Sequence, residues 1–265
     1  MLRSMYSGIG GMKNFQTKLD VIGNNIANVN TYGFKKGRTV FKDLVSQQIS
    51  GASAPTTTGL GGTNPKQVGL GATLGAIDTV QTQGSLQTTG RTLDVAISGN
   101  GFLMVQDPTT NETFYTRAGN LYLDGNGNLV NEDGYYVLDN TGNKIASITN
   151  ADSISIGADG KIAVVTNGTL NNSRQIGIAV FPNPDGLEKV GNNLYRATPN
   201  SGVVAMKIPN NGGAGKLVSG ALEMSNVDLS EEFTEMIVAQ RGFQANTRII
   251  TTSDQILEEL VNLKR

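Results

Sequence analysis

The sequence predicts an α+β fold: long N- and C-terminal helices that pair as a coiled coil, plus a central, mainly antiparallel β domain. Three observations support this fold class. Apolar residues recur every seven positions near both ends of the chain, and this spacing forms a helix stripe that a second helix can cover. The middle of the chain instead holds short apolar runs separated by Asn-Gly and Asp-Gly turns, which are typical of hairpins. At 265 residues, the chain also exceeds the size of most single cores.

These patterns divide the chain into three predicted parts. Residues 1–45 and 222–265 form a helical domain, and residues 72–221 form a β-rich domain. The segment between them, residues 46–71, is rich in Ser, Thr, Ala and Gly and carries almost no charge. Because it cannot bury much apolar area, we expect it to be a linker or an extended, loosely held loop.

The first helix is predicted from about Ser4 to Asn28, with Gly33 available to end the segment in a left-handed conformation. Its interior glycines each cost about 0.5–1 kcal/mol of helix stability relative to alanine. We therefore expect this helix to be frayed or disordered in an isolated subunit and to form when it is packed. A helix docked on its own domain is the alternative.

The last helix is predicted from about Asp228 to Leu263. Asp228 can cap its first turn, and Glu231 completes the spacing of a capping box. Polar Gln240, Thr247 and Asp254 are expected on the inward seam, where they would set register. The alternative is a surface helix that lies on the β domain.

The apolar rows of the two helices are the predicted assembly interface. Each row needs cover that the opposite helix and neighbouring copies can supply. The predicted interface residues are Met5, Met12, Phe15, Leu19, Ile22, Ile26, Leu229, Phe233, Met236, Ile237, Phe243, Ile250, Leu257 and Val261.

Short strands are predicted throughout the central region. Turn signals follow most of them, at Asn100-Gly101, Asp124–Gly127, Asp133-Gly134, Asp159-Gly160 and Asn167-Gly168. Hairpins in tandem favour a closed or sandwiched antiparallel domain. The predicted strands are 92–97, 102–105, 113–116, 120–123, 135–138, 154–156, 162–165 and 175–181.

Composition excludes most catalytic chemistry. The chain has no cysteine, histidine or tryptophan, which removes disulfides, thiol nucleophiles, Ser-His-acid triads and most transition-metal sites. The net charge of −1 gives no global attraction to nucleic acid or anionic membrane. Charged residues make up only 16% of the chain, so copies repel one another weakly and self-association is favoured. No secretory signal and no membrane-spanning run is expected.

Two motifs superficially resemble ligand sites. Asp124, Asn126 and Asn128 imitate the start of a calcium loop, but Leu129 and Tyr135 occupy the positions that require Gly and Glu, so a hairpin tip is expected. Carboxylate pairs at 231–232 and 258–259 are helix neighbours that point apart, so a solvated face is expected. We therefore predict no enzyme activity, no cofactor and no metal.

Basic residues cluster at Lys35, Lys36 and Arg38, beside Tyr32 and Phe34. No matching basic stripe occurs elsewhere, which argues against nucleic acid. A contact to acidic groups within an assembly, such as the Glu-bearing start of the last helix, is the preferred interpretation.

Several segments resemble the bacterial flagellar rod and hook axial proteins. Residues 19–36 (LDVIGNNIANVNTYGFKK) are similar to that family's opening signature. Residues 225–229 with 235–246 are similar to its closing segment. Its β domain is matched by residues 89–102, 115–120 and 186–195. The resemblance runs essentially from end to end.

The resemblance implies a structural subunit that polymerises helically into a hollow axial tube, which transmits torque and passes exported subunits. The implied partners are other copies of the chain, adjoining flagellar rod, hook, junction and cap proteins, and the flagellar export apparatus, without nucleic acid or membrane insertion. It places the protein in the flagellar basal body or hook, exported outside the cytoplasm without a cleavable signal peptide. A short hook protein and a distal rod protein both fit.

A secreted β-rich adhesin with a helical oligomerisation stalk is the competing interpretation. Deleting residues 1–28 separates the two, because a stalked binder would keep its ligand affinity whereas an axial subunit would lose assembly.

Overall fold

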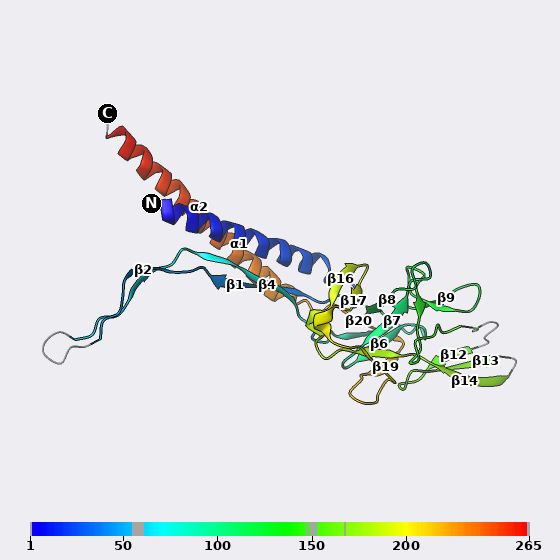
Figure 1. The fold of residues 1–265 in the computed structure, drawn as a ribbon. Coiled ribbons are helices and arrows are strands. Elements are labelled where there is room, and N and C mark those ends of the chain that lie inside the picture. The colour runs from blue at the N-terminus through cyan, green and yellow to red at the C-terminus, as the bar shows by residue number, and fades with distance from the viewer. Residues whose placement is uncertain (1, 55–60, 147, 149–152, 167, 264–265) are drawn as a thin grey trace. The chain divides into compact units, whose positions relative to one another are not determined.

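The computed structural model describes residues 2–54, 61–146, 148, 153–166 and 168–263 (Figure 1). The chain forms two compact units. Unit 1 consists of Met1–Ile26, Gly37–Asp78 and Asp228–Arg265, and unit 2 consists of Ala27–Lys36 and Thr79–Val227. The hairpin segment 37–78 thus belongs with the helices, and residues 222–227 belong with the β domain.

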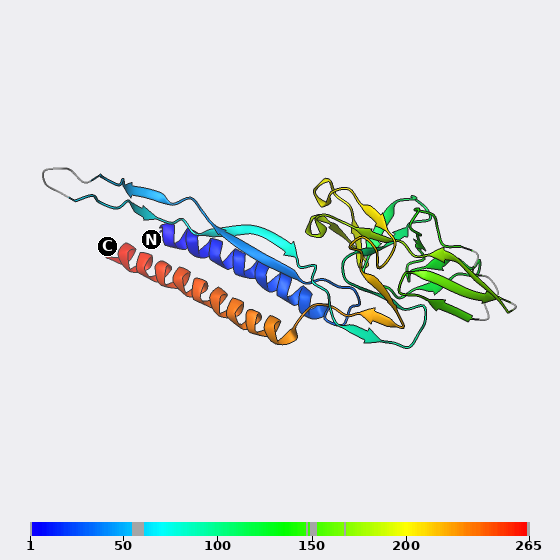
Figure 2. The same cartoon turned by 90° about the horizontal axis from the view of Figure 1, so that it is seen from below.

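Unit 1 contains the two long helices, α1 (Leu2–Ala27) and α2 (Leu229–Asn262). They lie side by side and antiparallel, with the two chain ends at the same end of the pair (Figure 2). Asn25 contacts Glu232 near one end, and Gly8 faces Ile250 toward the other. The α1 helix therefore has a packing partner within its own chain.

A two-stranded ribbon completes unit 1. Strand β1 (Gly37–Asp43) pairs with β4 (Ala72–Thr79), and β2 (Gln47–Ser50) pairs antiparallel with β3 (Lys66–Val68). The side chains of β2 and β3 are all exposed, so backbone hydrogen bonds hold this ladder without a core. The segment 46–71, predicted as a linker or extended loop, thus contains paired strands, and residues 55–60 within it lie outside the described residues.

Unit 2 is built from antiparallel strands. Its smaller sheets are β5 (Leu86–Thr88) with β20 (Ala221–Glu223), β6 (Val95–Ser98) with β19 (Lys216–Ser219), and β12 (Ser153–Ile156), β13 (Lys161–Thr166) and β14 (Thr169–Gln175). The strands of its largest sheet are β7 (Phe102–Gln106), β8 (Thr113–Thr116), β9 (Tyr122–Leu123), β10 (Leu129–Val130), β11 (Tyr136–Val137), β15 (Ile178–Val180), β16 (Glu188–Gly191), β17 (Leu194–Arg196) and β18 (Ala205–Lys207). The order is β16-β17-β8-β7-β11-β10-β9, and β15 pairs with β7 and β18. The short 3-10 helices η1 (Pro184–Gly186) and η2 (Pro199–Ser201) lie between strands.

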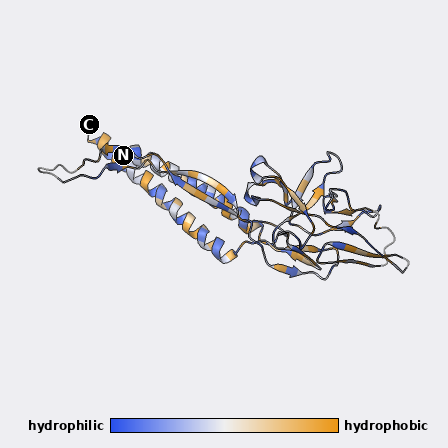
Figure 3. Ribbon diagram, turned by 60° about the horizontal axis from the view of Figure 1, so that its bottom comes forward, coloured by the Kyte–Doolittle hydropathy of each residue, from blue (hydrophilic) through white to orange (hydrophobic). Residues whose placement is uncertain are grey.

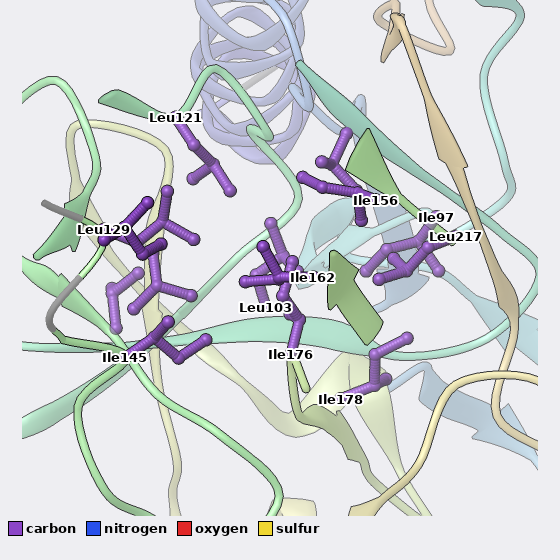
Figure 4. Close-up of a cluster of buried hydrophobic side chains, with 14 of the residues drawn as sticks. Ile97, Leu103, Leu121, Leu129, Ile145, Ile156, Ile162, Ile176, Ile178 and Leu217 are labelled. Atoms are coloured by element: carbon purple, nitrogen blue, oxygen red, sulfur yellow. The ribbon is translucent and has the colours of Figure 1, made fainter. Parts of the chain in front are cut away.

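Both faces of strand β7 are buried. Leu103 and Val105 point into the larger core cluster, whose isoleucines, leucines and valines come from several sheets (Figure 4). Phe102 and Met104 point into a second cluster on the other face. A strand covered on both faces reads as a continuous apolar run, which is why residues 102–105 do not alternate.

Four of the five predicted turns have the expected glycine geometry, and Asn167 of the fifth lies outside the described residues. Gly101, Gly127, Gly134 and Gly160 all have positive φ angles. The β9–β10 hairpin forms where the calcium-like motif occurs, and Asp124 there accepts hydrogen bonds from the backbone of Asn126 and Asn128. The hairpin tip predicted for this motif is confirmed.

Helix α2 begins as predicted. The Asp228 side chain accepts hydrogen bonds from the backbone N–H groups of Ser230 and Glu231. In the described part of the chain, neither helix has the length and apolarity needed to cross a bilayer.

Candidate assembly interface

The face of α2 that turns toward α1 carries two rows with seven-residue spacing. One row is the predicted one, and its members Met236, Phe243, Ile250 and Leu257 are half-buried. The other row is small or polar and consists of Glu232, Ala239, Asn246 and Ser253, of which all but Asn246 are fully buried.

The prediction of which polar residues of α2 face the seam is wrong by one position. Gln240, Thr247 and Asp254 are exposed, and the residue before each of them faces inward. One residue turns a helix by about 100°, which moves a side chain from the seam to its edge. Thr247 still reaches the Met12 sulfur at 3.4 Å from that edge.

Glycines bring the two helices close together. A Cβ atom at Gly242 would lie 2.5 Å from Cζ of Phe15, and one at Gly11 would lie 2.8 Å from Nδ2 of Asn246. At distances below 3.0 Å, the facing side chain would have to shift to admit a methyl group. Gly11 on α1 and Gly242 on α2 therefore allow the close contact of the two helices.

Polar contacts fix the register of the pair. The Asn25 side chain donates to Oε2 of Glu232 at 3.2 Å, and it exchanges two 2.9 Å hydrogen bonds with the backbone of Gly37. Lys18 forms an ion pair with Glu235. Because Asn25 and Glu232 are buried, a slipped register would leave both polar groups without these partners.

The predicted interface residues fall into three exposure classes. Ile22 is buried. Leu229, Phe233, Ile237 and Val261 are exposed, with 39–67% of their surface accessible. The remaining residues are half-buried: Met5, Met12, Phe15, Leu19, Ile26, Met236, Phe243, Ile250 and Leu257. Their role in assembly stays a prediction.

A second apolar face of α2 was missed by the sequence reasoning. Val238, Ile249, Ile256, Leu260 and Leu263 are exposed by 43–83%. Hydrophobic residues recur along the whole helix in Figure 3. The signal was present in the sequence, because residues 249, 256 and 263 are also seven apart. One apolar row thus faces α1 while another remains uncovered in the subunit.

A buried ion cluster in unit 2 involves the basic segment after α1. Lys35 Nζ lies 2.5 Å from Oε1 of Glu223, and Arg117 Nη1 lies 3.1 Å from Oε2 of the same carboxylate. Gly84 N–H also donates to Glu223, and Lys35 donates to the Thr82 carbonyl. Burial lowers the pKa of Lys35, and the neighbouring positive charge of Arg117 adds to this, against the opposing pull of Glu223.

For Lys35, this cluster corrects the interpretation of the basic segment. Lys35 is fully buried and pairs with Glu223 inside unit 2, and Arg38 pairs with Asp78 at 3.6 Å. Glu232, at the start of α2, instead receives a hydrogen bond from Asn25. Glu223 and Arg117 lie far from Lys35 in sequence, and neither has a pattern that marks it as a partner.

Comparison with known protein families matches three regions of the chain. The flagellar hook protein FlgE/F/G D1 domain matches residues 96–164, the flagellar basal body rod FlgEFG protein C-terminal domain matches residues 218–263, and the flagella basal body rod protein family matches residues 5–35. The flagellar basal-body rod protein FlgG of Bacillus subtilis is 61% identical over the full length of both chains. The chain belongs to the flagellar rod and hook axial protein family.

Other members of the flagellar family align with the whole chain as well. The basal-body rod protein FlgG of Borreliella burgdorferi is 40% identical, and the hook protein FlgE of the same organism is 30% identical over an alignment of 444 residues. The chain is therefore a structural subunit of the bacterial flagellar rod–hook axis. Flagellar rod and hook proteins polymerise and contact other flagellar components, and they are not an enzyme family.

Proposed function

We propose that the chain is a rod subunit of the distal type and not a hook subunit. The alignment with the Bacillus FlgG rod protein needs only 267 positions for a chain of 265 residues. The hook alignment needs 444 positions, so that hook protein carries long insertions which this chain lacks. Identity of 61% along the full length is the observation that carries the proposal.

The subunit assembles through its terminal helices. We propose that α1 and α2 pair as a coiled coil in the inner wall of a hollow tube, and that the exposed face of α2 packs on neighbouring copies. Burying this face would add stabilisation of roughly 25 cal/mol per Å² of apolar area. Contacts of this kind that do not close into a ring produce an open helical filament, which can transmit torque and pass exported subunits through its channel.

We also propose an export route for the chain and the partners that it contacts. A chain without disulfides and with glycine-weakened helices suits passage in an unfolded state through the flagellar export apparatus. Adjoining rod, hook, junction and cap proteins would contact the two ends of the homopolymer.

Substitution on the exposed face of α2 tests the assembly proposal. Ile249 is 43% exposed, whereas its neighbour Ile250 contacts α1 at Gly8. Ile249→Lys should therefore block polymerisation and leave the subunit folded, because the lysine stays in water in the monomer and is buried only in the polymer. Gln255→Lys adds the same charge at an exposed polar position and should polymerise normally.

Sedimentation measures the polymer fraction, and circular dichroism checks the fold of each variant. Normal filaments from Ile249→Lys would refute the assembly proposal.

Electron microscopy of wild-type polymers tests the type of subunit. Straight, stiff filaments are expected from a rod protein, and curved, supple filaments would refute the rod assignment.

A further inference from the structure

A cavity in unit 2 contains polar groups without partners. It measures about 150 Å³ and is lined by Gln81, Phe102, Arg117, Phe181, Pro182 and other residues of unit 2. Among the residues that the structure describes, both polar atoms of the Gln81 amide and Nε of Arg117 are buried without a hydrogen-bond partner. Leaving such groups unpaired costs about 1–3 kcal/mol each, which favours a polar occupant, either water or a ligand.

Of the buried ion cluster, only Arg117 lines the cavity, and the charge of that cluster indicates which occupant fits. Lys35 and Arg117 both contact the single carboxylate of Glu223, so this buried cluster holds two positive charges and one negative charge. Buried charges are normally paired, and the Arg117 side chain is only 5% exposed. An anion beside the free Nε of Arg117 would balance the cluster.

The aromatic rings and the hydrogen-bond donors of the cavity wall indicate which class of anion fits. Arg117 lies over the Phe102 ring, with Cζ 5.2 Å from the ring centre, and Phe181 meets Phe102 edge-on. Ring edges carry partial positive charge and favour an anion, whereas the ring faces fix the guanidinium. The Arg117 Nε–H and the Gln81 NH₂ are two donors, and a planar carboxylate has two oxygens to accept them, while Gln81 Oε1 needs a separate donor such as water.

We propose that this cavity is a carboxylate-binding site formed by Arg117 and Gln81. The carboxylate comes either from a small organic acid in solution or from an Asp or Glu side chain of a neighbouring copy in the polymer. The second source rests on the proposed assembly, and the first does not.

Titration of the unpolymerised full-length chain with sodium acetate tests the site directly. Protein labelled with ¹⁵N-arginine reports on the Arg117 Nε–H signal, which is identified through its contact with the Phe102 ring. Acetate should shift this signal saturably, and sodium chloride at equal ionic strength should not. Gln81→Leu should weaken acetate binding at least about tenfold, since it removes one of two hydrogen bonds. Gln87→Leu, at an exposed position of β5, should not change it.

An unchanged signal, or an equal shift with chloride, would overturn the proposal and leave a cavity that holds only water. This result does not depend on polymerisation, so it is distinct from failure of the rod proposal. Solid-state spectra of the polymer in acetate-free buffer separate the two sources. A signal already at the shifted position identifies a side chain of a neighbouring copy, and a signal that moves only on addition of acetate identifies a free acid.

Discussion

At the scale of single residues, glycine has opposite effects on α1 alone and on the helix pair. Gly8 and Gly11 lower the helix propensity of α1, yet Gly8 contacts Ile250 of α2 and Gly11 leaves the space that Asn246 of α2 occupies. On α2, Gly242 likewise leaves space for the Phe15 ring of α1. The local cost in helix stability is offset by closer packing of the pair.

We predict that Gly242→Ala destabilises the folded chain by about 1–2 kcal/mol, because the new methyl group would force the Phe15 ring to move. Gly23→Ala is the matched control. No atom lies within 4 Å of the Cβ position at Gly23, so that change should stabilise the helix by about 0.5–1 kcal/mol. Chemical denaturation of both variants measures the difference, and equal effects of the two substitutions would contradict the close contact.

Glu223 is the acidic partner of two buried cationic side chains. Glu223→Ala leaves Lys35 and Arg117 buried beside each other without an anion, which should cost about 3–5 kcal/mol. Glu188→Ala removes an exposed partner of Arg196 and should leave the melting temperature nearly unchanged. Thermal unfolding compares the two, and a small effect of Glu223→Ala would show that the cluster is solvated.

At the scale of elements, the helices were predictable because their signals are local. The seven-residue rows, the Asp228 cap and the glycine turns all depend on neighbours in sequence. Strand β14, Thr169–Gln175, was missed because its sequence is mostly polar and lacks a regular apolar pattern. Its partner strand β13 supplies Ile162 and Val164 to the core instead.

The start of α2 depends on its cap. Asp228→Ala should destabilise the helix by about 1 kcal/mol, because the first N–H groups lose their acceptor. Asp228→Asn keeps an acceptor oxygen and should have little effect. Hydrogen exchange of the amides of Ser230 and Glu231 measures both changes, and equal protection in the alanine variant would argue against the cap.

At the scale of the whole molecule, aspartates in the turns of unit 2 make it sensitive to acid. Hydrogen bonds hold the pKa of each below its ordinary value near 3.8. The main donors are Thr109 N–H for Asp107, the Asn128 side chain for Asp124 and Lys161 N–H for Asp159. For Asp139, bonds from Thr141 and Asn143 outweigh the upward effect of burial.

Because these pKa values are lower in the native state, the unfolded chain binds more protons in the acid range. The stabilisation is therefore complete above about pH 5 and is lost as the pH falls through the native pKa values. We expect the melting temperature to decrease between pH 5 and pH 3. Asp124→Asn, which keeps the acceptor without the charge, should decrease less steeply, and a melting temperature that rises on acidification would contradict the prediction.

The sequence by itself determined the helices, the turns, the antiparallel central region and the resemblance to flagellar axial proteins. These features depend on local spacing, capping and backbone preference. Only the tertiary structure decided which row of α2 faces α1, that 37–78 joins the helical unit, and that Lys35, Arg117 and Glu223 meet. Those outcomes depend on contacts between residues far apart in the chain, where packing and the pairing of buried charge select the partner and no local pattern marks it.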